Sequence, residues 1–152
     1  MTKAGQKPRQ IYERRMIMEK SLIYTAYTAG AEIPVGNTVP VGSIIRRYGK
    51  CIDATGSAIN LTERGYYDVA VSATFTAAAA GNVRLTLLQD GVEVPGATAA
   101  ETITTAATEI ANIGIVAVVR IQCCDTSALS VRVDGTTAPT ISSMAIKAVK
   151  VI

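Results

Sequence analysis

Histidine and tryptophan are absent from this chain of 152 residues, and its aromatic residues amount to six tyrosines and one phenylalanine. Without histidine there can be no Ser-His-Asp or Cys-His nucleophile pair, no histidine acid–base step and no histidine-ligated zinc. An enzyme would have to use carboxylates, lysines or cysteines. Carboxylates such as Asp53, Glu63, Asp68 and Asp90 show no paired spacing, so the sequence predicts that the protein is not an enzyme.

Signatures of metals and cofactors are missing as well. The three cysteines are Cys51 and the adjacent pair Cys123 and Cys124, with no C-x-x-C spacing, and no D-x-D-x-D calcium loop occurs. Neighbouring cysteines in a strand point to opposite faces, which argues against an ordinary disulfide between them. We expect no metal and no cofactor, and we interpret the cysteines as small buried apolar residues of a protein synthesised in the cytoplasm.

Long hydrophobic runs are also lacking, although 49% of the residues are hydrophobic. The best run, Ile110 to Val119, includes Asn112 and Gly114 and is shorter than the roughly 18 residues that a membrane span needs. After Arg15 only three apolar residues precede Glu19, whereas a signal peptide needs about 7–15 apolar residues in succession. We therefore expect no membrane partner, and the remaining destination for the apolar surface is another subunit.

Positive charge is confined to the N-terminus. The whole chain has a net charge of +3. Residues 1–20 contain six basic and two acidic residues, whereas the other 132 contain nine basic and ten acidic residues. The sequence thus divides into a basic arm, residues 1–20, and a nearly neutral domain, residues 21–152. From Arg9 to Lys20 the sequence can form a short helix, because Ile11, Arg15, Met18 and Leu22 follow one another at intervals of three or four residues.

Such an arm can dock on an acidic protein surface, bind nucleic acid or stay solvated. One tyrosine and no aromatic platform make nucleic acid the least favoured partner, and we expect none. We expect the arm to anchor the chain on another protein. The candidate anchoring residues are Arg9, Tyr12, Arg14, Arg15 and Lys20.

The domain shows the patterns of successive β-strands. From Tyr67 to Thr76 apolar and polar residues alternate strictly, as in a half-buried antiparallel strand. Asp90-Gly91 between two apolar stretches is a strong hairpin signal. The four alanines of residues 77–80 are too few for a helix. Nine or ten short strands without an intervening helix predict an all-β sandwich or barrel.

Other expected strands are less regular. Their ranges are Ser21 to Tyr27, Ser43 to Ile52, Ala99 to Ala106, Ile110 to Ile121, Leu129 to Asp134, and Ser142 to Ile152. We expect Pro95-Gly96 to close the second arm of the hairpin. A bulge near Lys150 would explain why the alternation of the last strand slips there.

Two blocks of this sequence resemble the globular domain of the C1q/TNF-like superfamily. One block is Gly65-Tyr66-Tyr67-Asp68-Val69, and the other runs from Val83 to Gly96 with Asp90-Gly91 and Val94-Pro95-Gly96. The similarity covers residues 41–152 and is greatest to bacterial and phage members, such as the C-terminal domain of the exosporium collagen-like glycoprotein. It implies a ten-stranded antiparallel jelly-roll sandwich that assembles as a homotrimer around an apolar axis.

The strand from Ile110 to Ile121 is apolar on both faces, so we expect it to form the trimer seam. Either Val116 and Val118 face the axis while the odd-numbered residues fill the protomer core, or the reverse. The candidate interface residues are Ile113, Ile115, Val116, Val118 and Val119.

Two functions remain open. The first is a virion structural protein of a bacteriophage: a trimeric capsid decoration or head-fibre-type protein, located in the virion and anchored by its arm to a capsid or tail protein. The alternative is a tail-associated or surface binding module that recognises host glycan or receptor through exposed loops. Arg46-Arg47-Tyr48 and Asp125-Thr126-Ser127 are the loop candidates. We favour the first.

Overall fold

Apolar and polar residues alternate along most of the chain, and this alternation produces ten strands. The computed structural model describes residues 20–122 and 125–152, and this part contains no helix. The strands are β1 (Leu22–Tyr27), β2 (Ser43–Tyr48), β3 (Ile52–Thr55), β4 (Ala58–Leu61), β5 (Gly65–Ala77), β6 (Gly81–Gln89), β7 (Val92–Ile103), β8 (Ala111–Ile121), β9 (Ser127–Gly135) and β10 (Pro139–Lys150). The helix expected before Lys20 lies outside the described residues.

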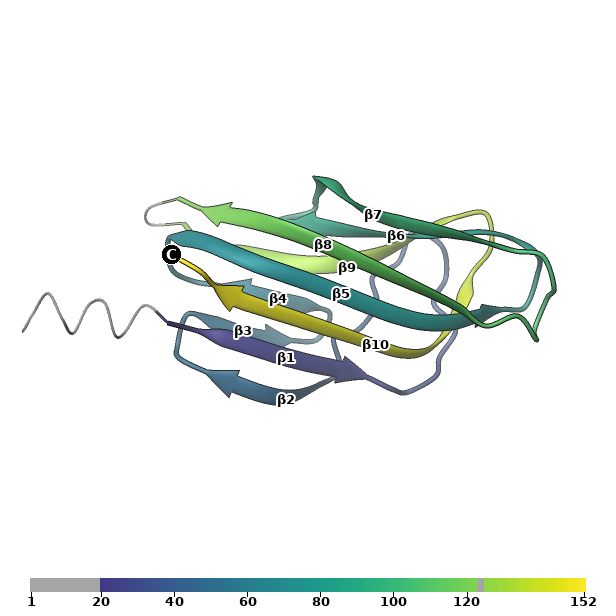
Figure 1. Cartoon of the computed structure of the whole chain (residues 1–152), viewed down its shortest axis with the longest axis horizontal. Coiled ribbons are helices and arrows are strands. Elements are labelled where there is room, and N and C mark those ends of the chain that lie inside the picture. Colours follow the sequence, from purple (N-terminus) through teal and green to yellow (C-terminus); the bar gives the residue numbers. More distant parts are fainter. Residues whose placement is uncertain (1–19, 123–124) are drawn as a thin grey trace, which may run out of the picture.

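The strands form two antiparallel sheets that pack face to face (Figure 1). The first sheet has the order β2-β1-β10-β5-β8, and the second has the order β3-β4-β9-β6-β7. This arrangement confirms the expected jelly-roll sandwich of ten antiparallel strands. No helix that could span a bilayer occurs in the described part of the chain.

Strand β5 supplies the centre of the core. Its inward side chains Tyr67, Val69, Val71, Ala73 and Phe75 are all buried, as the alternation of the sequence predicts. Buried residues of the second sheet pack against the same core, among them Val83, Leu85, Leu87, Leu129, Val131 and Val133. Branched aliphatic side chains fill most of the space between the sheets, so the core needs few aromatic residues.

The predicted hairpin joins β6 to β7. Asp90 has φ 53° and Gly91 has φ 80°, so both central residues adopt the positive φ of a two-residue type I′ turn. The Asp90 carboxylate also accepts hydrogen bonds from Ser127 Oγ at 2.8 Å and from Ala128 N at 2.9 Å. The turn is therefore fixed to the start of β9 as well as to its own strands.

Several predicted boundaries were wrong. Pro95-Gly96 does not close the arm, because β7 continues to Ile103 and includes most of the segment expected as a separate strand. Proline is tolerated there because β7 is the edge of its sheet and bulges between Glu93 and Thr98, where the pairing with β6 is interrupted. The segment expected as one strand from Ser43 to Ile52 divides at Gly49, with φ 83°, into β2 and β3.

The bulge of β10 was also misplaced. Its register shifts between Ile141 and Ser143, not near Lys150. After that bulge Met144, Ile146 and Ala148 all face the core, and Lys150 remains in phase with them at 7% exposure. Lys150 is thus a buried residue that points into the core. Because it is charged, the sequence pattern indicated a bulge at this position, although the alternation of inward and outward residues continues through it.

Candidate interface on the outer face of the first sheet

The outer face of the first sheet, which is turned away from the second sheet, is built of residue rows that cross the strands. One row consists of Tyr48, Leu22, Val149, Asp68 and Val118. The next consists of Arg46, Tyr24, Lys147, Ala70 and Val116. A third row contains only small residues: Ala26, Ala145, Ser72 and Gly114. This face is therefore mostly apolar or small, and its three rows contain three charged residues, Arg46, Lys147 and Asp68.

The row of small residues leaves a hollow across the sheet. A shallow depression of about 300 Å³ lies here, lined among others by Tyr24, Ser72, Gly114 and Ala145. A Cβ atom at Gly114 would lie 3.8 Å from the backbone oxygen of Val71, which is ordinary contact. The fold of one chain thus does not require glycine at this position, and its effect is to deepen the hollow beside Val116.

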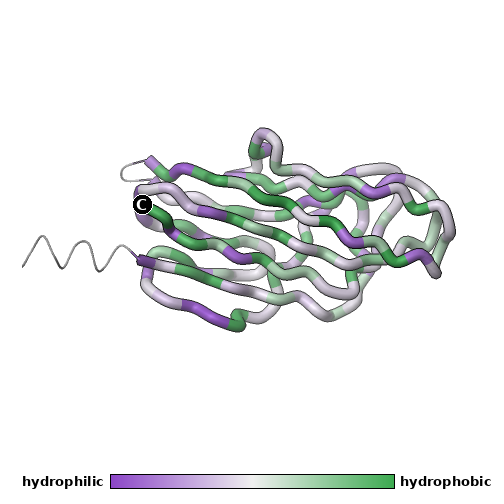
Figure 2. Tube along the Cα trace, viewed as in Figure 1, coloured by the Kyte–Doolittle hydropathy of each residue, from purple (hydrophilic) through white to green (hydrophobic). Residues whose placement is uncertain are grey.

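Exposed apolar side chains are concentrated on this sheet. Val116 is 77% exposed and Val118 is 63% exposed, although both are valines in the middle of a strand. The exposed large hydrophobic residues on strands of the first sheet are Tyr24, Ile44, Ile45, Tyr48, Tyr66, Val116 and Val118. In the second sheet the described strands have only Val92, at the hairpin. Figure 2 shows green, hydrophobic stretches along the strands of the first sheet, which face the viewer.

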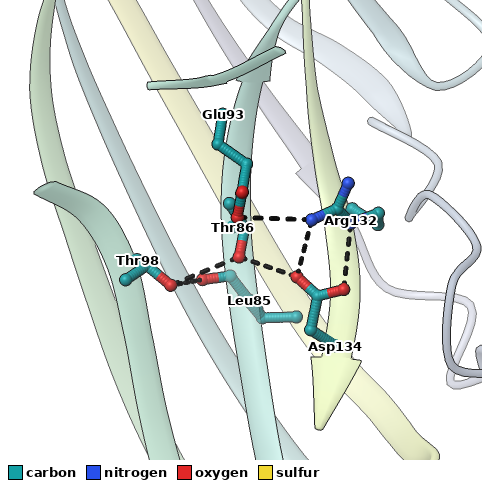
Figure 3. Close-up of polar contacts among 6 residues, drawn as sticks. All are labelled: Leu85, Thr86, Glu93, Thr98, Arg132 and Asp134. Carbon is teal, nitrogen blue, oxygen red and sulfur yellow. Dashed lines mark hydrogen bonds and ion pairs between the residues drawn. The ribbon is translucent and has the colours of Figure 1, made fainter. Parts of the chain in front are cut away.

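The outer face of the second sheet differs from that of the first, because its polar side chains form hydrogen bonds and ion pairs with one another (Figure 3). Arg132 Nε donates to Asp134 Oδ1 at 2.9 Å, Thr86 Oγ1 donates to Asp134 Oδ2 at 2.8 Å, and Arg132 also pairs with Glu93 at 3.4 Å. The hydrogen bond from Arg132, followed by that from Thr86, lowers the pKa of the Asp134 carboxyl. Such a hydrogen-bonded surface suits contact with water, whereas an exposed apolar sheet marks an interface.

The structure separates the predicted interface residues into two groups. Val116 and Val118 point outward, on the outer face of the first sheet. Ile115 and Val119 are buried in the core of their own chain at 3% and 2% exposure, and Ile113 packs partly buried against that core. Their side chains are therefore not available to a neighbouring chain. The contact of Val116 and Val118 with another copy stays a prediction.

Sequence reasoning missed the other residues of this face, notably Tyr24 on β1 and the row of small residues. The signal was present in the strand from Tyr67 to Thr76, where Ala70 and Ser72 alternate with the core residues. Only the register of neighbouring strands shows that Ala145 and Gly114 continue the same row.

The predicted anchoring residues Arg9, Tyr12, Arg14 and Arg15 lie outside the described residues. Lys20 is exposed directly before β1, at the end of the sandwich where the C-terminus also lies (Figure 1). An arm that precedes Lys20 would therefore start from this end of the domain.

The two loop candidates for glycan recognition lie on different sheets. Arg46-Arg47-Tyr48 belongs to edge strand β2, where Arg47 Nε donates to Ile52 O at 3.1 Å and its guanidinium lies 3.8 Å from Asp53. Ser127 begins β9 and is nearly buried against Asp90. The depression of about 330 Å³ beside Ser127 includes none of the β2 residues. No common site joins the two candidates.

The carboxylates considered for catalysis are dispersed. Asp53 lies on β3, Glu63 between β4 and β5, Asp68 on the outer face of β5, and Asp90 in the hairpin turn. Within residues 20–122 and 125–152 no group of three or more Cys, Asp or Glu side chains is placed to hold a metal ion.

Cys51 is buried, as expected. It is 3% exposed, and its Sγ donates a hydrogen bond to Glu63 Oε2 at 2.7 Å. Burial, together with the Glu63 carboxylate, raises the pKa of the thiol, so it stays protonated and unreactive at neutral pH. Cys123 and Cys124 lie outside the described residues.

At the level of sequence no family model matches the chain, and no relative is found among curated proteins. At the level of structure similar folds are numerous. The Eiger TNF of S. frugiperda matches with a TM-score of 0.66 at 12% identity, over 88% of this chain and 94% of that one. The globular domain of the zebrafish complement 1qA protein matches with a TM-score of 0.60 at 7% identity, over 88% and 98%. The fold is that of TNF and C1q domains.

The PRD1 vertex protein P5 shares the same fold. It matches with a TM-score of 0.56 at 13% identity, over 89% of this chain and 99% of that one. The TNF/C1q-type sandwich therefore occurs in a phage vertex protein as well as in animal proteins. At these identities the likeness establishes the fold alone.

Proposed function

We propose that this chain is a virion structural protein of a bacteriophage: a capsid decoration or head-fibre-type homotrimer, held on the particle by its N-terminal arm. The observation that carries the proposal is the exposed apolar face of the first sheet around Val116 and Val118. The fold shared with a phage vertex protein supports the virion setting, and the C1q/TNF-like resemblance supports the trimer. No catalytic role is proposed.

The outer face of the first sheet has the composition that a seam between copies requires. Val116 and Val118 project beside a hollow of small residues, so a neighbouring copy can bury the valines with few polar groups to desolvate. Complete burial of a valine side chain contributes roughly 1.5–3 kcal/mol. A trimer would bury six such side chains, two from each chain. Their burial would offset the translational and rotational freedom that the three chains lose on association.

The arm supplies the attachment to the particle. Residues 1–20 are the basic part of the chain, and Lys20, the last of them, lies exposed at one end of the domain. An arm at the end of the sandwich can reach an acidic surface on a capsid or tail protein without disturbing the seam, which lies on the broad face of the first sheet. Attachment and trimerisation are thus assigned to separate parts of the molecule.

The test deletes the arm and measures whether the chain still binds to particles. Deletion of residues 1–20 is expected to leave a folded trimer that no longer co-sediments with particles, because the ten described strands and the core between them lie within residues 22–150. Full-length chain added to particles lacking it is expected to rebind, and antibody against the chain is expected to label them in electron micrographs. Purified particles that carry no label would contradict the virion assignment, and undiminished binding of the deleted form would contradict the role of the arm.

A further inference from the structure

A second feature lies at the end of the sandwich where β1 begins and β10 ends. A cavity of about 400 Å³ opens there, separate from the depression on the broad face. Its lining residues are Arg64, Gly65, Tyr66, Arg120, Ile121, Gln122, Lys150 and Ile152. The lining contains three cations and no carboxylate side chain, and its one anion is the main-chain carboxylate of Ile152.

Lys150 is the unusual member of the lining. It is only 7% exposed, and lysine is rarely buried to this extent without a partner for its charge. Among the described residues no carboxylate lies within 4.0 Å of its ammonium, and all described ion pairs involve Arg47 or Arg132. Glu63 lies near in space, since its carboxylate and the Lys150 ammonium both act on the Cys51 thiol, but it does not come within 4.0 Å of that ammonium.

The backbone holds this cavity in shape. Gly65, with φ 143°, lies so close to the end of the chain that a Cβ atom there would clash with the backbone oxygen of Ile152 and would approach Lys150 Cε at 3.1 Å. Tyr66 and the segment after β10 exchange backbone hydrogen bonds, from Tyr66 N to Ile152 O at 3.1 Å and from Val151 N to Tyr66 O at 2.8 Å. Glycine at 65 therefore lets Lys150 pass beneath the start of β5.

Arg120 completes the wall from β8. Its guanidinium lies over the Tyr66 ring, 5.8 Å from the ring centre, a contact that orients the side chain through the face of the guanidinium and not through its N–H groups. Among the described residues no carboxylate pairs with Arg120 or Arg64. Gln122 adds an amide that can donate to an oxygen atom.

We propose that this cavity binds an oxyanion, the sulfate, phosphate or carboxylate group of a small ligand. Three cations from three elements line it, and an oxyanion would give the buried Lys150 a counter-charge that no side-chain carboxylate of the described residues supplies within 4.0 Å. The volume also admits a single sugar ring, so the oxyanion can belong to an acidic saccharide as well as to a free inorganic ion. The site belongs to one chain and does not depend on the proposed trimer.

The test measures binding to the full chain by isothermal titration calorimetry at constant ionic strength. The probes are sulfate, inorganic phosphate, glucuronate and a sulfated disaccharide, with glucose as the neutral control. Binding of charged probes but not of glucose is expected. Tighter binding of the saccharide anions would identify an acidic saccharide as the source, and tighter binding of sulfate or phosphate would identify an inorganic ion.

Variants locate the binding. Arg64→Gln and Arg120→Gln are each expected to weaken binding at least about threefold, and Lys150→Met about tenfold, with heat stability measured in parallel. Arg84→Gln, an exposed arginine on the second sheet, is the matched control and is expected to leave binding unchanged. Absence of binding by the wild-type chain, or equal losses with Arg84→Gln and Arg120→Gln, would overturn the proposal. If Lys150→Met fails to fold, the two exposed arginines still decide it.

Discussion

At the scale of single residues, Asp134 shows how a polar side chain stabilises a surface that stays in water. Its two oxygens accept hydrogen bonds from Arg132 and Thr86, which lie on adjacent strands of the second sheet. These bonds favour the charged carboxylate and lower its pKa in the folded state. Folding is therefore linked to pH through this residue.

Asp134→Asn is expected to lower the free energy of unfolding by about 1 kcal/mol at pH 7, because the amide cannot replace the charge-assisted bonds. The contribution of Asp134 is complete above the unfolded-state pKa of about 3.9 and is lost as pH falls through the lower folded-state value, so the deficit should shrink towards pH 2. Urea unfolding at both pH values measures it. Asp53→Asn, which breaks a longer and more exposed pair with Arg47, serves as the control. Equal losses from the two substitutions would contradict this account.

At the scale of elements, the β6–β7 hairpin shows where the sequence was most informative. A two-residue type I′ turn requires positive φ at both central positions, and Asp-Gly satisfies this requirement locally. The same residue, Asp90, then binds the first residues of β9. Local turn chemistry and a tertiary contact thus specify the same hairpin.

Gly91→Ala is expected to lower the free energy of unfolding by about 1–2 kcal/mol, since φ of 80° is unfavourable for a residue with a Cβ atom. Nothing lies within 4 Å of that Cβ, so the effect would come from the backbone and not from a clash. Gly91→Asn is the control, because asparagine tolerates positive φ and should retain most of the stability. Thermal unfolding followed by circular dichroism measures both, and equal losses would show that side-chain contact matters instead.

The sequence predicted elements well where one physical signal dominated. Strict alternation located β5, and the turn signals located the hairpin and the end of β9. It failed where tertiary position decided the outcome: Pro95 continues a strand because β7 is an edge that bulges there, and Lys150 is buried because β10 keeps its inward phase up to the contact with Gly65. The composition of β8 could not show which face is outward, because apolar residues occupy both faces. The outward face of β8 is decided by the position of the second sheet, which covers Ile115 and Val119 and leaves Val116 and Val118 exposed.

At the scale of the whole molecule, the two sheets have opposite outer faces. The second is hydrogen-bonded and charged, and the first is apolar and hollowed by small residues. The high apolar content of the sequence is thus divided between a core within the chain and an exposed face that we assign to contacts between copies. Lys20 and the cationic cavity lie at one end of the sandwich, where Tyr66 and Arg120 connect the cavity to the outer face beyond Val118.

The central claim is that Val116 and Val118 form the seam of a homotrimer. Size-exclusion chromatography with light scattering on the wild-type chain, Val116→Asp and Val92→Asp tests it most directly, because Val92 is a comparably exposed valine on the other sheet. A wild-type trimer, a monomeric or aggregated Val116→Asp and a trimeric Val92→Asp are the predicted results, since a charge buried in the seam would have no partner. A monomeric wild-type chain, or a Val116→Asp variant that remains a trimer, would contradict the account.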